Sequence, residues 1–296
     1  MHDSLAAAVL AGLGGMFGWG LADFFAKKTV DAIGDVASLV WAHLCGTAVI
    51  GAILLVQVGA GETVALGWTD WLSLAAFGAL QAVVYLFVYR GFGKGQVAIL
   101  APLFASFAGL VAFVSVVALG EPSSVQLVVG LVVVFAGVVL LNADPARLRL
   151  RRFGLIRTPG FNEIAIATVL ATAWTLGWDR FIAGHDWLSC AAVMYAFMTI
   201  ALLVYGRTQR ASFSVVRGGS LWAYLALIGG CEVGAYVAVS WGYEATTHTS
   251  VVALVSGAFA LPTMALARIF LGERTGRMRG FASIMIVAGI MFLSTR

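Results

Sequence analysis

The sequence predicts an all-α integral membrane protein in which ten transmembrane helices form two inverted five-helix repeats. Three observations lead to this prediction: the composition, the spacing of the apolar runs, and a similarity between the two halves of the chain. Of the 296 residues, 61% are hydrophobic and 11% are charged, whereas about a quarter of the residues in soluble domains are charged. The chain therefore has too little polar surface for a soluble globule of this size.

Ten apolar runs are predicted to cross about 30 Å of hydrocarbon as helices. They cover residues 5–26, 33–56, 68–89, 97–119, 124–141, 164–183, 187–205, 221–243, 249–270 and 280–293. The first run has no basic region before it and no clear cleavage site, which favours a retained helix over a signal peptide. Because no polar segment between the runs is long enough for a soluble domain, the function must lie within the bundle.

Basic residues predict the orientation of the chain in the membrane. Sixteen of the eighteen Lys and Arg residues lie in the odd-numbered connections, and only Arg180 and Arg296 do not. Because short loops rich in Lys and Arg stay in the cytoplasm, we expect cytoplasmic odd-numbered connections, both termini outside, and a cell (inner) membrane location. The net charge of +4 is then explained by the topology, and a nucleic-acid partner is not needed to explain it. The expected partner is the lipid bilayer. The basic strip at 146–157 could also hold anionic lipid headgroups.

The sequence carries no pattern for a metal, a cofactor or a catalytic centre. Cys45, Cys190 and Cys231 all fall within predicted helices and form no CxxC pair, so we expect neither a metal cluster nor a disulfide framework. No HExxH or GxSxG motif occurs. The stretch "GFGKGQ" from Gly91 lacks the context of a phosphate-binding loop and is interpreted as a turn.

The two halves of the chain resemble each other. "QAVVYLFVYRGF" in the third helix matches "EVGAYVAVSWGY" in the eighth at a constant shift of 151 residues. The matched residues are Gln81, Tyr85, Gly91 and Phe92 with Glu232, Tyr236, Gly242 and Tyr243. "LGE" ends the fourth and ninth helices, and a glycine follows sixteen residues later in both halves. A repeat of five helices must insert the second time upside down, as in many secondary transporters, whose binding sites lie between the halves.

This arrangement resembles the drug/metabolite transporter superfamily, specifically its proteins with two EamA domains. The early "WGLADFFAKK" is also similar to first helices of EamA domains. The resemblance implies one EamA-like repeat at 1–145, a basic connecting loop at 146–161 and a second repeat at 162–296. Its motifs are short and structural, so they identify the fold better than the cargo, which in relatives includes amino acids, other metabolites, nucleotide sugars and organic phosphates.

Three polar residues, His43, Gln81 and Glu232, lie near the middle of their predicted helices, too deep to reach an interface. Gln81 and Glu232 are repeat-equivalent, so the inverted two-fold predicts comparable depth beside a central substrate site. Tyr85 and Tyr236 lie one turn further along the same faces. Interhelical hydrogen bonds would also explain His43 and Gln81, whereas a buried acid is more often functional. Glu232 is therefore predicted to bind substrate, a coupling proton or both, with His43 able to share that proton.

Asp23 is open to two interpretations. Lys27 follows one turn later on the same face, so an interfacial pair would satisfy the carboxylate; alternatively, Asp23 and Trp19 form a gate at the mouth of the cavity. The approximate counterpart of Asp23 in the second half is Asp179, which inversion would place near the opposite membrane face together with Arg180.

Two tryptophans and two prolines complete the predictions. Trp178 is expected in the aromatic belt at the membrane face, whereas Trp174 lies deeper and could stack on a planar or cationic ligand. Pro102 and Pro262 are expected to interrupt the fourth and ninth helices.

The predicted function is a secondary transporter, and more specifically an exporter, for a small polar or amphipathic metabolite such as an amino acid. It would work by alternating access at a central cavity, with proton coupling possible. The alternative is an integral-membrane enzyme acting on a lipid-borne substrate, which would need clustered catalytic groups near an interface. A purely structural or sensor role is a third option, but it would not require matched polar residues in both halves.

Overall fold

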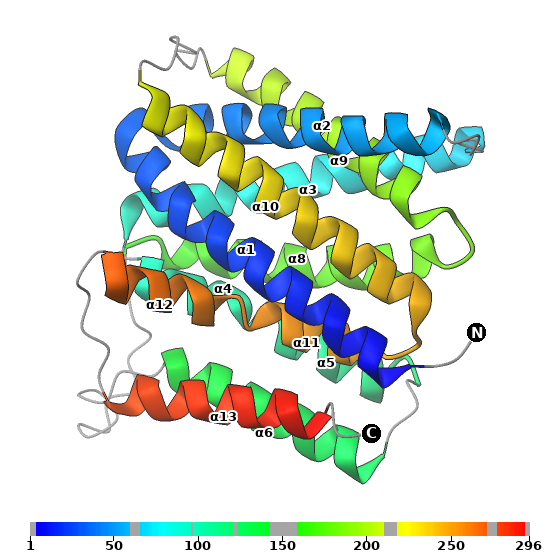
Figure 1. Cartoon of the computed structure of the whole chain (residues 1–296), viewed down its shortest axis with the longest axis vertical. Helices are drawn as coiled ribbons and strands as arrows, with labels where there is room; N and C mark the ends of the chain where they lie inside the picture. Colours follow the sequence, from blue (N-terminus) through cyan, green and yellow to red (C-terminus); the bar gives the residue numbers. More distant parts are fainter. Residues whose placement is uncertain are drawn as a thin grey trace.

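The computed structural model describes residues 4–59, 66–95, 97–120, 124–142, 159–209, 218–270 and 277–293, and the regular structure within them is helical. The first half contains α1 (Leu5–Ile33), α2 (Asp35–Gly59), α3 (Trp68–Lys94), α4 (Val97–Ala105), α5 (Phe107–Val117) and α6 (Val125–Asn142). The second contains α8 (Phe161–Ile182), α9 (Trp187–Thr208), α10 (Gly219–Ala245), α11 (Thr249–Gly257), α12 (Ala260–Phe270) and α13 (Arg277–Leu293). Because α4 with α5 and α11 with α12 each form one broken helix, these residues make the ten predicted helices (Figure 1).

The fourth and ninth helices are each broken near the middle. The second break, at Ala258, lies four residues before Pro262. This is where a proline interrupts a helix, because Pro262 has no N–H to donate to the carbonyl of Ala258 and its ring clashes with that carbonyl. The first break, at Ser106, follows Pro102 by four residues, so the prediction that Pro102 itself interrupts the helix is wrong. Instead the Ser106 hydroxyl donates to the carbonyl of Leu103 (2.7 Å), a local bond that competes with continuation of the helix.

Helix contacts repeat between the halves as an approximate two-fold axis would require. α1 packs along α10 just as α3 packs along α8, and α3 meets α9 just as α2 meets α10. α6 and α13, the last helices of the two halves, pair with each other at one edge of the bundle (Figure 1). α1 begins and α13 ends on the same side of the bundle, as an even number of crossings demands.

The bundle presents an apolar exterior and a closely packed interior. By length and composition, six described helical segments can cross a membrane: α1, α2, α3, α9, α10 and the broken helix Thr249–Phe270. Large side chains such as Val56, Phe113 and Ile284 are exposed on the outside, where a bilayer would solvate them. Inside, α1 approaches α10 so closely that a Cβ added to Gly18 would lie 2.6 Å from the carbonyl oxygen of Cys231, as at interfaces built on small residues.

Most of the predicted connecting loop 146–161 lies outside the described residues, which resume at 159. The two "LGE" glutamates, at positions 121 and 273, and Arg296 also lie outside them.

Candidate functional site: a central cavity and a buried acid cluster

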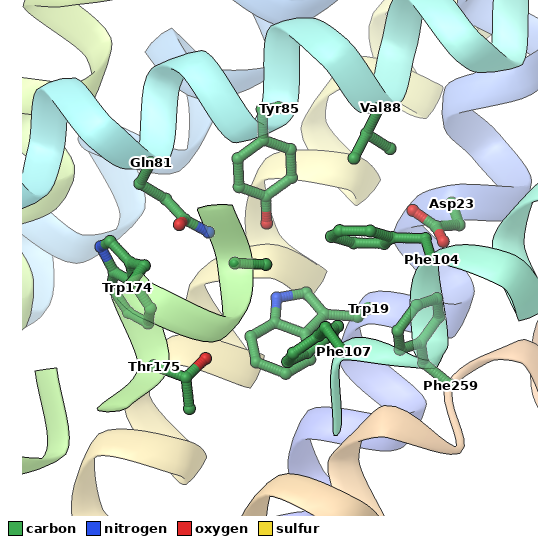
Figure 2. Close-up of a pocket in the computed structure, with 11 residues that line it drawn as sticks. Trp19, Asp23, Gln81, Tyr85, Val88, Phe104, Phe107, Trp174, Thr175 and Phe259 are labelled. Carbon is green, nitrogen blue, oxygen red and sulfur yellow. The ribbon is translucent and has the colours of Figure 1, made fainter. Parts of the chain in front are cut away.

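A small cavity lies at the centre of the bundle, between the two halves. α1, α3, α4 and α5 line it from the first half, while α8 and the break between α11 and α12 line it from the second (Figure 2). Its volume is ≈ 40 Å³, room for about three waters. The lining residues are Trp19, Asp23, Gln81, Tyr85, Val88, Phe104, Phe107, Ala171, Trp174, Thr175 and Phe259.

Aromatic rings make up most of the cavity wall. Trp19 from the first half and Trp174 from the second both meet Tyr236 edge-on, with ring centroids 5.8 and 5.9 Å apart. The indole N–H of Trp174 donates to the carbonyl of Phe77 (3.1 Å), which fixes the orientation of its ring. Trp174 is thus buried in the bundle and lines the cavity.

Three polar atoms of the lining have no hydrogen-bond partner among the described residues. They are the Oδ2 atom of Asp23, the Oε1 atom of Gln81 and the indole Nε1 of Trp19, and all three are buried. Figure 2 shows Gln81 at one end of the cavity, Asp23 at the other and Trp19 between them. Buried polar atoms without partners are rare in native proteins, so three around one cavity indicate a place where a ligand or water completes the bonding.

The predicted pair between Asp23 and Lys27 does not form. Lys27 instead pairs with Asp31, one turn further along α1, at 2.7 Å, and the Nζ atom of Lys28 lies 5.1 Å from the ring centroid of Tyr224. Both neighbouring cations therefore bind elsewhere. Asp23, which is 8% exposed, faces the cavity with no cation beside it within the described chain.

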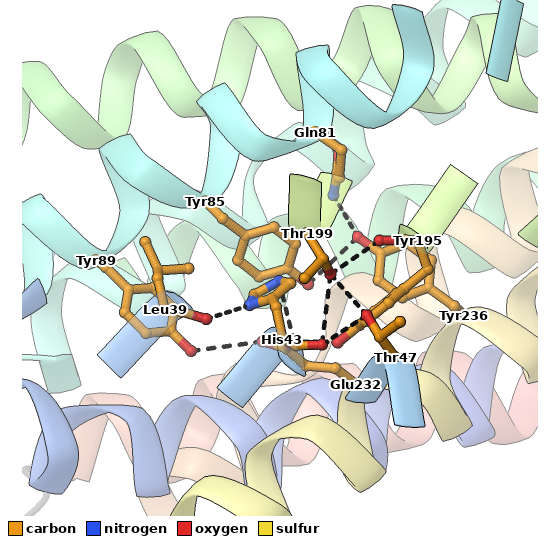
Figure 3. Close-up of polar contacts among 10 residues, drawn as sticks. All are labelled: Leu39, His43, Thr47, Gln81, Tyr85, Tyr89, Tyr195, Thr199, Glu232 and Tyr236. Carbon is orange, nitrogen blue, oxygen red and sulfur yellow. Dashed lines mark hydrogen bonds and ion pairs between the residues drawn. The ribbon is translucent and has the colours of Figure 1, made fainter. Parts of the chain in front are cut away.

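Glu232, by contrast, lies outside the cavity lining and inside a polar cluster at the interfaces of α2, α3, α9 and α10 (Figure 3). Its Oε2 atom accepts from the hydroxyl of Tyr195 (3.2 Å) and its Oε1 atom from the hydroxyl of Tyr89 (3.5 Å). The Nε2 atom of His43 is 3.3 Å from Oε2, although the two are not aligned as a hydrogen bond. The sequence could not show that His43 and Glu232 lie side by side, because they belong to different helices.

One nitrogen of the His43 ring has a defined hydrogen. The Nδ1 atom of His43 lies 2.9 Å from the carbonyl oxygen of Leu39, and because a carbonyl only accepts, Nδ1 carries a hydrogen. Nε2 therefore faces the Glu232 carboxyl either as the acceptor of a neutral ring or as a second N–H. In both arrangements one proton, on Nε2 or on the carboxyl, leaves the pair without net charge, so the cluster can hold a proton.

Two hydrogen bonds and one aromatic contact connect the cavity with this cluster. The amide nitrogen of Gln81 donates to the hydroxyl of Tyr236 (2.6 Å), which lies 3.4 Å from the hydroxyl of Tyr85. The His43 ring meets Tyr85 edge-on, with centroids 5.1 Å apart. The repeat-equivalent tyrosines thus touch at the boundary between the halves, while Gln81 and Glu232 occupy different surroundings, one in the cavity and one behind it.

The second pair of gate candidates, Asp179 and Arg180, lies in a separate hollow. This hollow has a volume of ≈ 400 Å³ and is lined by the ends of α5, α8, α10 and α11. Asp179 accepts a hydrogen bond from the hydroxyl of Thr249 (2.8 Å), whereas Arg180 is exposed. Asp179 therefore has a partner that its counterpart Asp23 lacks.

The prediction that Trp178 belongs to the aromatic belt is wrong. Its side chain is fully buried, stacks on Trp174 with a centroid distance of 5.3 Å and donates to the hydroxyl of Ser240 (3.2 Å). It forms a second layer that supports the cavity wall.

Contacts between polar side chains tie α3 to α8 at both ends of their interface. Lys94 pairs with Glu163 where α3 ends and α8 begins. At the opposite end, the Oδ1 atom of Asp70 lies 3.4 Å from the Nε2 atom of His185. These ties were not predicted from the sequence, because the charged residues face each other only once the contact between α3 and α8 is known.

The sequence analysis also missed Tyr89, Tyr195 and the phenylalanines of the cavity wall. A signal existed for Tyr89, which continues the series Gln81, Tyr85, Tyr89 at intervals of four residues on one face of α3. No such signal existed for Tyr195, because its partner Glu232 comes from another helix.

Comparisons with known proteins agree with this architecture. A scan against protein-family models matches residues 6–143 to the EamA-like transporter family. A solved structure described as a crystal structure of a protein matches with a TM-score of 0.72 and 19% sequence identity, covering 98% of this chain and 96% of that chain. At this identity the likeness shows the fold alone. No curated protein matches the chain.

Proposed function

We propose, given that this chain belongs to the EamA-like transporter family through residues 6–143, that its central cavity carries a small polar or amphipathic metabolite across the membrane by alternating access. The family implies a secondary transporter of a small molecule, and not an enzyme. The chain is accordingly a multi-pass membrane protein. The transported molecule, the direction of transport and the orientation of the chain in the membrane are proposals.

One observation carries the proposal: a small cavity with unpartnered polar atoms lies between the two halves. At ≈ 40 Å³ it cannot hold a molecule of amino-acid size, so a substrate enters only when the helices around it move apart. The two ties between α3 and α8, Lys94 with Glu163 and Asp70 with His185, lie at opposite ends of the bundle. Opening one tie while the other stays closed would expose the cavity to one side at a time.

The proposed orientation places the odd-numbered connections in the cytoplasm. The tie between Lys94 and Glu163 would then be the cytoplasmic one, and the tie between Asp70 and His185 the external one. We propose export as the direction, with the cytoplasmic opening as the entry. A proton held between His43 and Glu232 is the proposed coupling site, because the cluster adjoins the cavity through Tyr85.

Cross-linking tests alternating access without knowledge of the substrate. In a chain whose three cysteines are replaced, one variant carries Lys94→Cys with Glu163→Cys and a second carries Asp70→Cys with His185→Cys. A cleavable bifunctional thiol reagent locks one end in each. We expect each lock to leave an additional cysteine at Thr175, in the cavity wall, reactive toward impermeant maleimide from the opposite face only.

Reductive cleavage of either cross-link should restore labelling from both faces. The four single-cysteine variants, treated with the same reagent, control for chemical modification alone. Labelling of the Thr175 cysteine from both faces in both locked forms would contradict alternating access.

A further inference from the structure

We infer that the central cavity selects an organic ammonium ion with an apolar or aromatic body and rejects ligands that carry a free carboxylate. This inference rests on the proposed function and narrows its cargo. It goes against amino acids, the example that the sequence suggested, because their carboxylate would need a cation in the cavity.

The charge of the cavity wall is the first argument. Asp23 is the one charged side chain among the described lining residues, and no Lys, Arg or His lines the cavity with it. The cations nearest in sequence, Lys27 and Lys28, are held by Asp31 and by aromatic rings. A carboxylate without a protein cation in apolar surroundings is costly, and a ligand ammonium would supply the missing charge.

The hydrogen-bonding capacity of the wall gives the same answer. Two of the three unpartnered atoms, Asp23 Oδ2 and Gln81 Oε1, are acceptors, which an ammonium group with its N–H donors can satisfy. The amide nitrogen of Gln81 already donates to Tyr236 (2.6 Å), which fixes Oε1 toward the remaining space. The unpartnered buried donor among the described lining residues is the indole N–H of Trp19, and the hydroxyls of Tyr85 and Thr175 also line the space. None of these donors carries a positive charge that would compensate a carboxylate for its lost hydration.

The aromatic wall is the third argument. Trp19, Tyr85 and Trp174 together with three phenylalanines surround the space, and ring faces attract cations and repel anions. Trp178, stacked behind Trp174, holds that ring in place. The same rings provide apolar contact for the body of the ligand.

The nearest groups outside the wall do not offset this preference. His43 meets the ring of Tyr85 edge-on behind the cavity wall, and it faces Glu232 at 3.3 Å, so any positive charge on it is matched. Tyr89 and Tyr195 face the same carboxyl as neutral hydroxyls. Arg180 lies in the separate hollow beside Asp179, where it cannot meet a carboxylate bound in the central cavity.

Three ligands with one ring and different charges test the inference: phenethylamine (ammonium only), phenylalanine (ammonium and carboxylate) and 3-phenylpropionate (carboxylate only). Binding to the full-length protein in lipid nanodiscs is measured by equilibrium dialysis of radiolabelled ligand. We expect phenethylamine to bind at least about tenfold more tightly than either of the others, because an unpaired buried charge is strongly penalised.

Two variants connect this preference to Asp23. Asp23→Asn keeps the shape of the side chain and removes its charge, and it should weaken phenethylamine binding at least about tenfold. Asp186→Asn is the matched control: Asp186 caps α9 through the N–H of Ser189 (3.0 Å), away from the cavity, and Asn caps a helix equally well. Asp23→Glu, which retains the charge, should still prefer the amine even if the affinity falls.

Equal or tighter binding of phenylalanine or phenylpropionate, absence of binding by all three ligands, or unchanged amine binding by a folded Asp23→Asn protein would each overturn the inference. The proposed function would survive these outcomes, because the cross-linking experiment tests it without any ligand. Conversely, amine selectivity together with a cavity open to both faces would retain the binding site and reject transport by alternating access.

Discussion

Two buried acids, Asp23 on α1 and Glu232 on α10, lie close to the centre of the same bundle and have opposite surroundings. Glu232 is 1% exposed, and both of its oxygens accept hydrogen bonds from tyrosines while His43 approaches one of them. Asp23 is 8% exposed and has no partner among the described residues. An acid with hydrogen-bond partners on other helices holds those helices together and can store a proton. An acid without a partner in a cavity wall is instead available to a ligand or to water.

The difference has an energetic consequence. Removing one member of a satisfied polar cluster leaves its partners unsatisfied, which costs more than the bond itself contributes. Removing an acid that has no partner instead removes the free-energy cost of burying an unpaired carboxyl group. Substitutions at the two positions should therefore differ in their effect on stability: a loss at Glu232, and no change or a small gain at Asp23.

Glu232→Ala should cause the largest loss of stability. The hydroxyls of Tyr89 and Tyr195 would lose their acceptor, at about 1–3 kcal/mol for each buried group left unpaired. With partial relaxation we expect a loss of about 2–4 kcal/mol, seen as a lower melting temperature in detergent. A wild-type melting temperature would show that the cluster does not stabilise the bundle.

Glu232→Gln separates the structural role of this residue from coupling. Gln keeps an acceptor for one tyrosine and removes the titration, so the variant should fold and insert while transport, or its dependence on pH, is lost. The measurement is uptake into proteoliposomes across a series of pH values. If the folded variant moves an identified substrate with the wild-type rate, affinity and pH profile, Glu232 is a structural residue only.

Thr249→Val should have an intermediate effect on stability. It removes the hydroxyl that donates to Asp179 at 2.8 Å, and such bonds between membrane helices contribute about 0.6 kcal/mol on average and at most about 1.7. Because the hollow beside Asp179 is wide enough for water, the carboxylate can be resolvated, which limits the loss. A decrease as large as that of Glu232→Ala would show that Asp179 is as tightly buried as Glu232.

Asp23→Asn should leave the melting temperature unchanged or raise it slightly, by the equivalent of about 1 kcal/mol or less, although it removes the charge needed for binding. Residues arranged for function commonly cost stability in this way. A loss comparable to that of Glu232→Ala would mean that Asp23 has a structural partner, and the contrast between the two acids would fail.

The sequence predicted the fold well, because each transmembrane helix is an apolar run of nearly fixed length. The run at 187–205 became α9 at Trp187–Thr208, and the run at 68–89 became α3 at Trp68–Lys94. The contact between the hydroxyls of Tyr85 and Tyr236 was not predicted, although the two residues match at the constant shift of 151 residues. The interruption of the fourth helix was attributed to Pro102, whereas the break lies at Ser106. A serine that bonds to its own helix is harder to recognise in a sequence than a proline.

The partners of the site residues could not be predicted, because they depend on which helices face each other. Asp23 and Asp31 lie at equal distances on either side of Lys27, so spacing alone cannot choose between them. Asp31 forms the pair because it lies at the exposed end of α1. Trp178 was assigned to the membrane face for a similar reason: in a helix that is apolar on all sides, periodicity does not show which face is covered by protein.

The last prediction concerns the side of the membrane to which the cavity opens near Asp23. The cysteine substitutions that test it should have no effect on stability. Asp23 lies in the second half of α1, toward the end followed by the first connection. Cytoplasmic odd-numbered connections would therefore place Asp23 on the cytoplasmic side of Glu232, where an exporter loads its substrate.

In a cysteine-free background, a cysteine within the basic segment 147–157 should resist an impermeant maleimide in intact cells and react after permeabilisation. A cysteine at position 294 should react in intact cells. Both positions lie outside the described residues, and a small substitution there should leave the melting temperature and the binding of phenethylamine unchanged, which controls for misfolding. The reverse labelling pattern would place Asp23 toward the outside, so that the same cavity and the same acid would load substrate for import while the fold and the contrast with Glu232 remain as described.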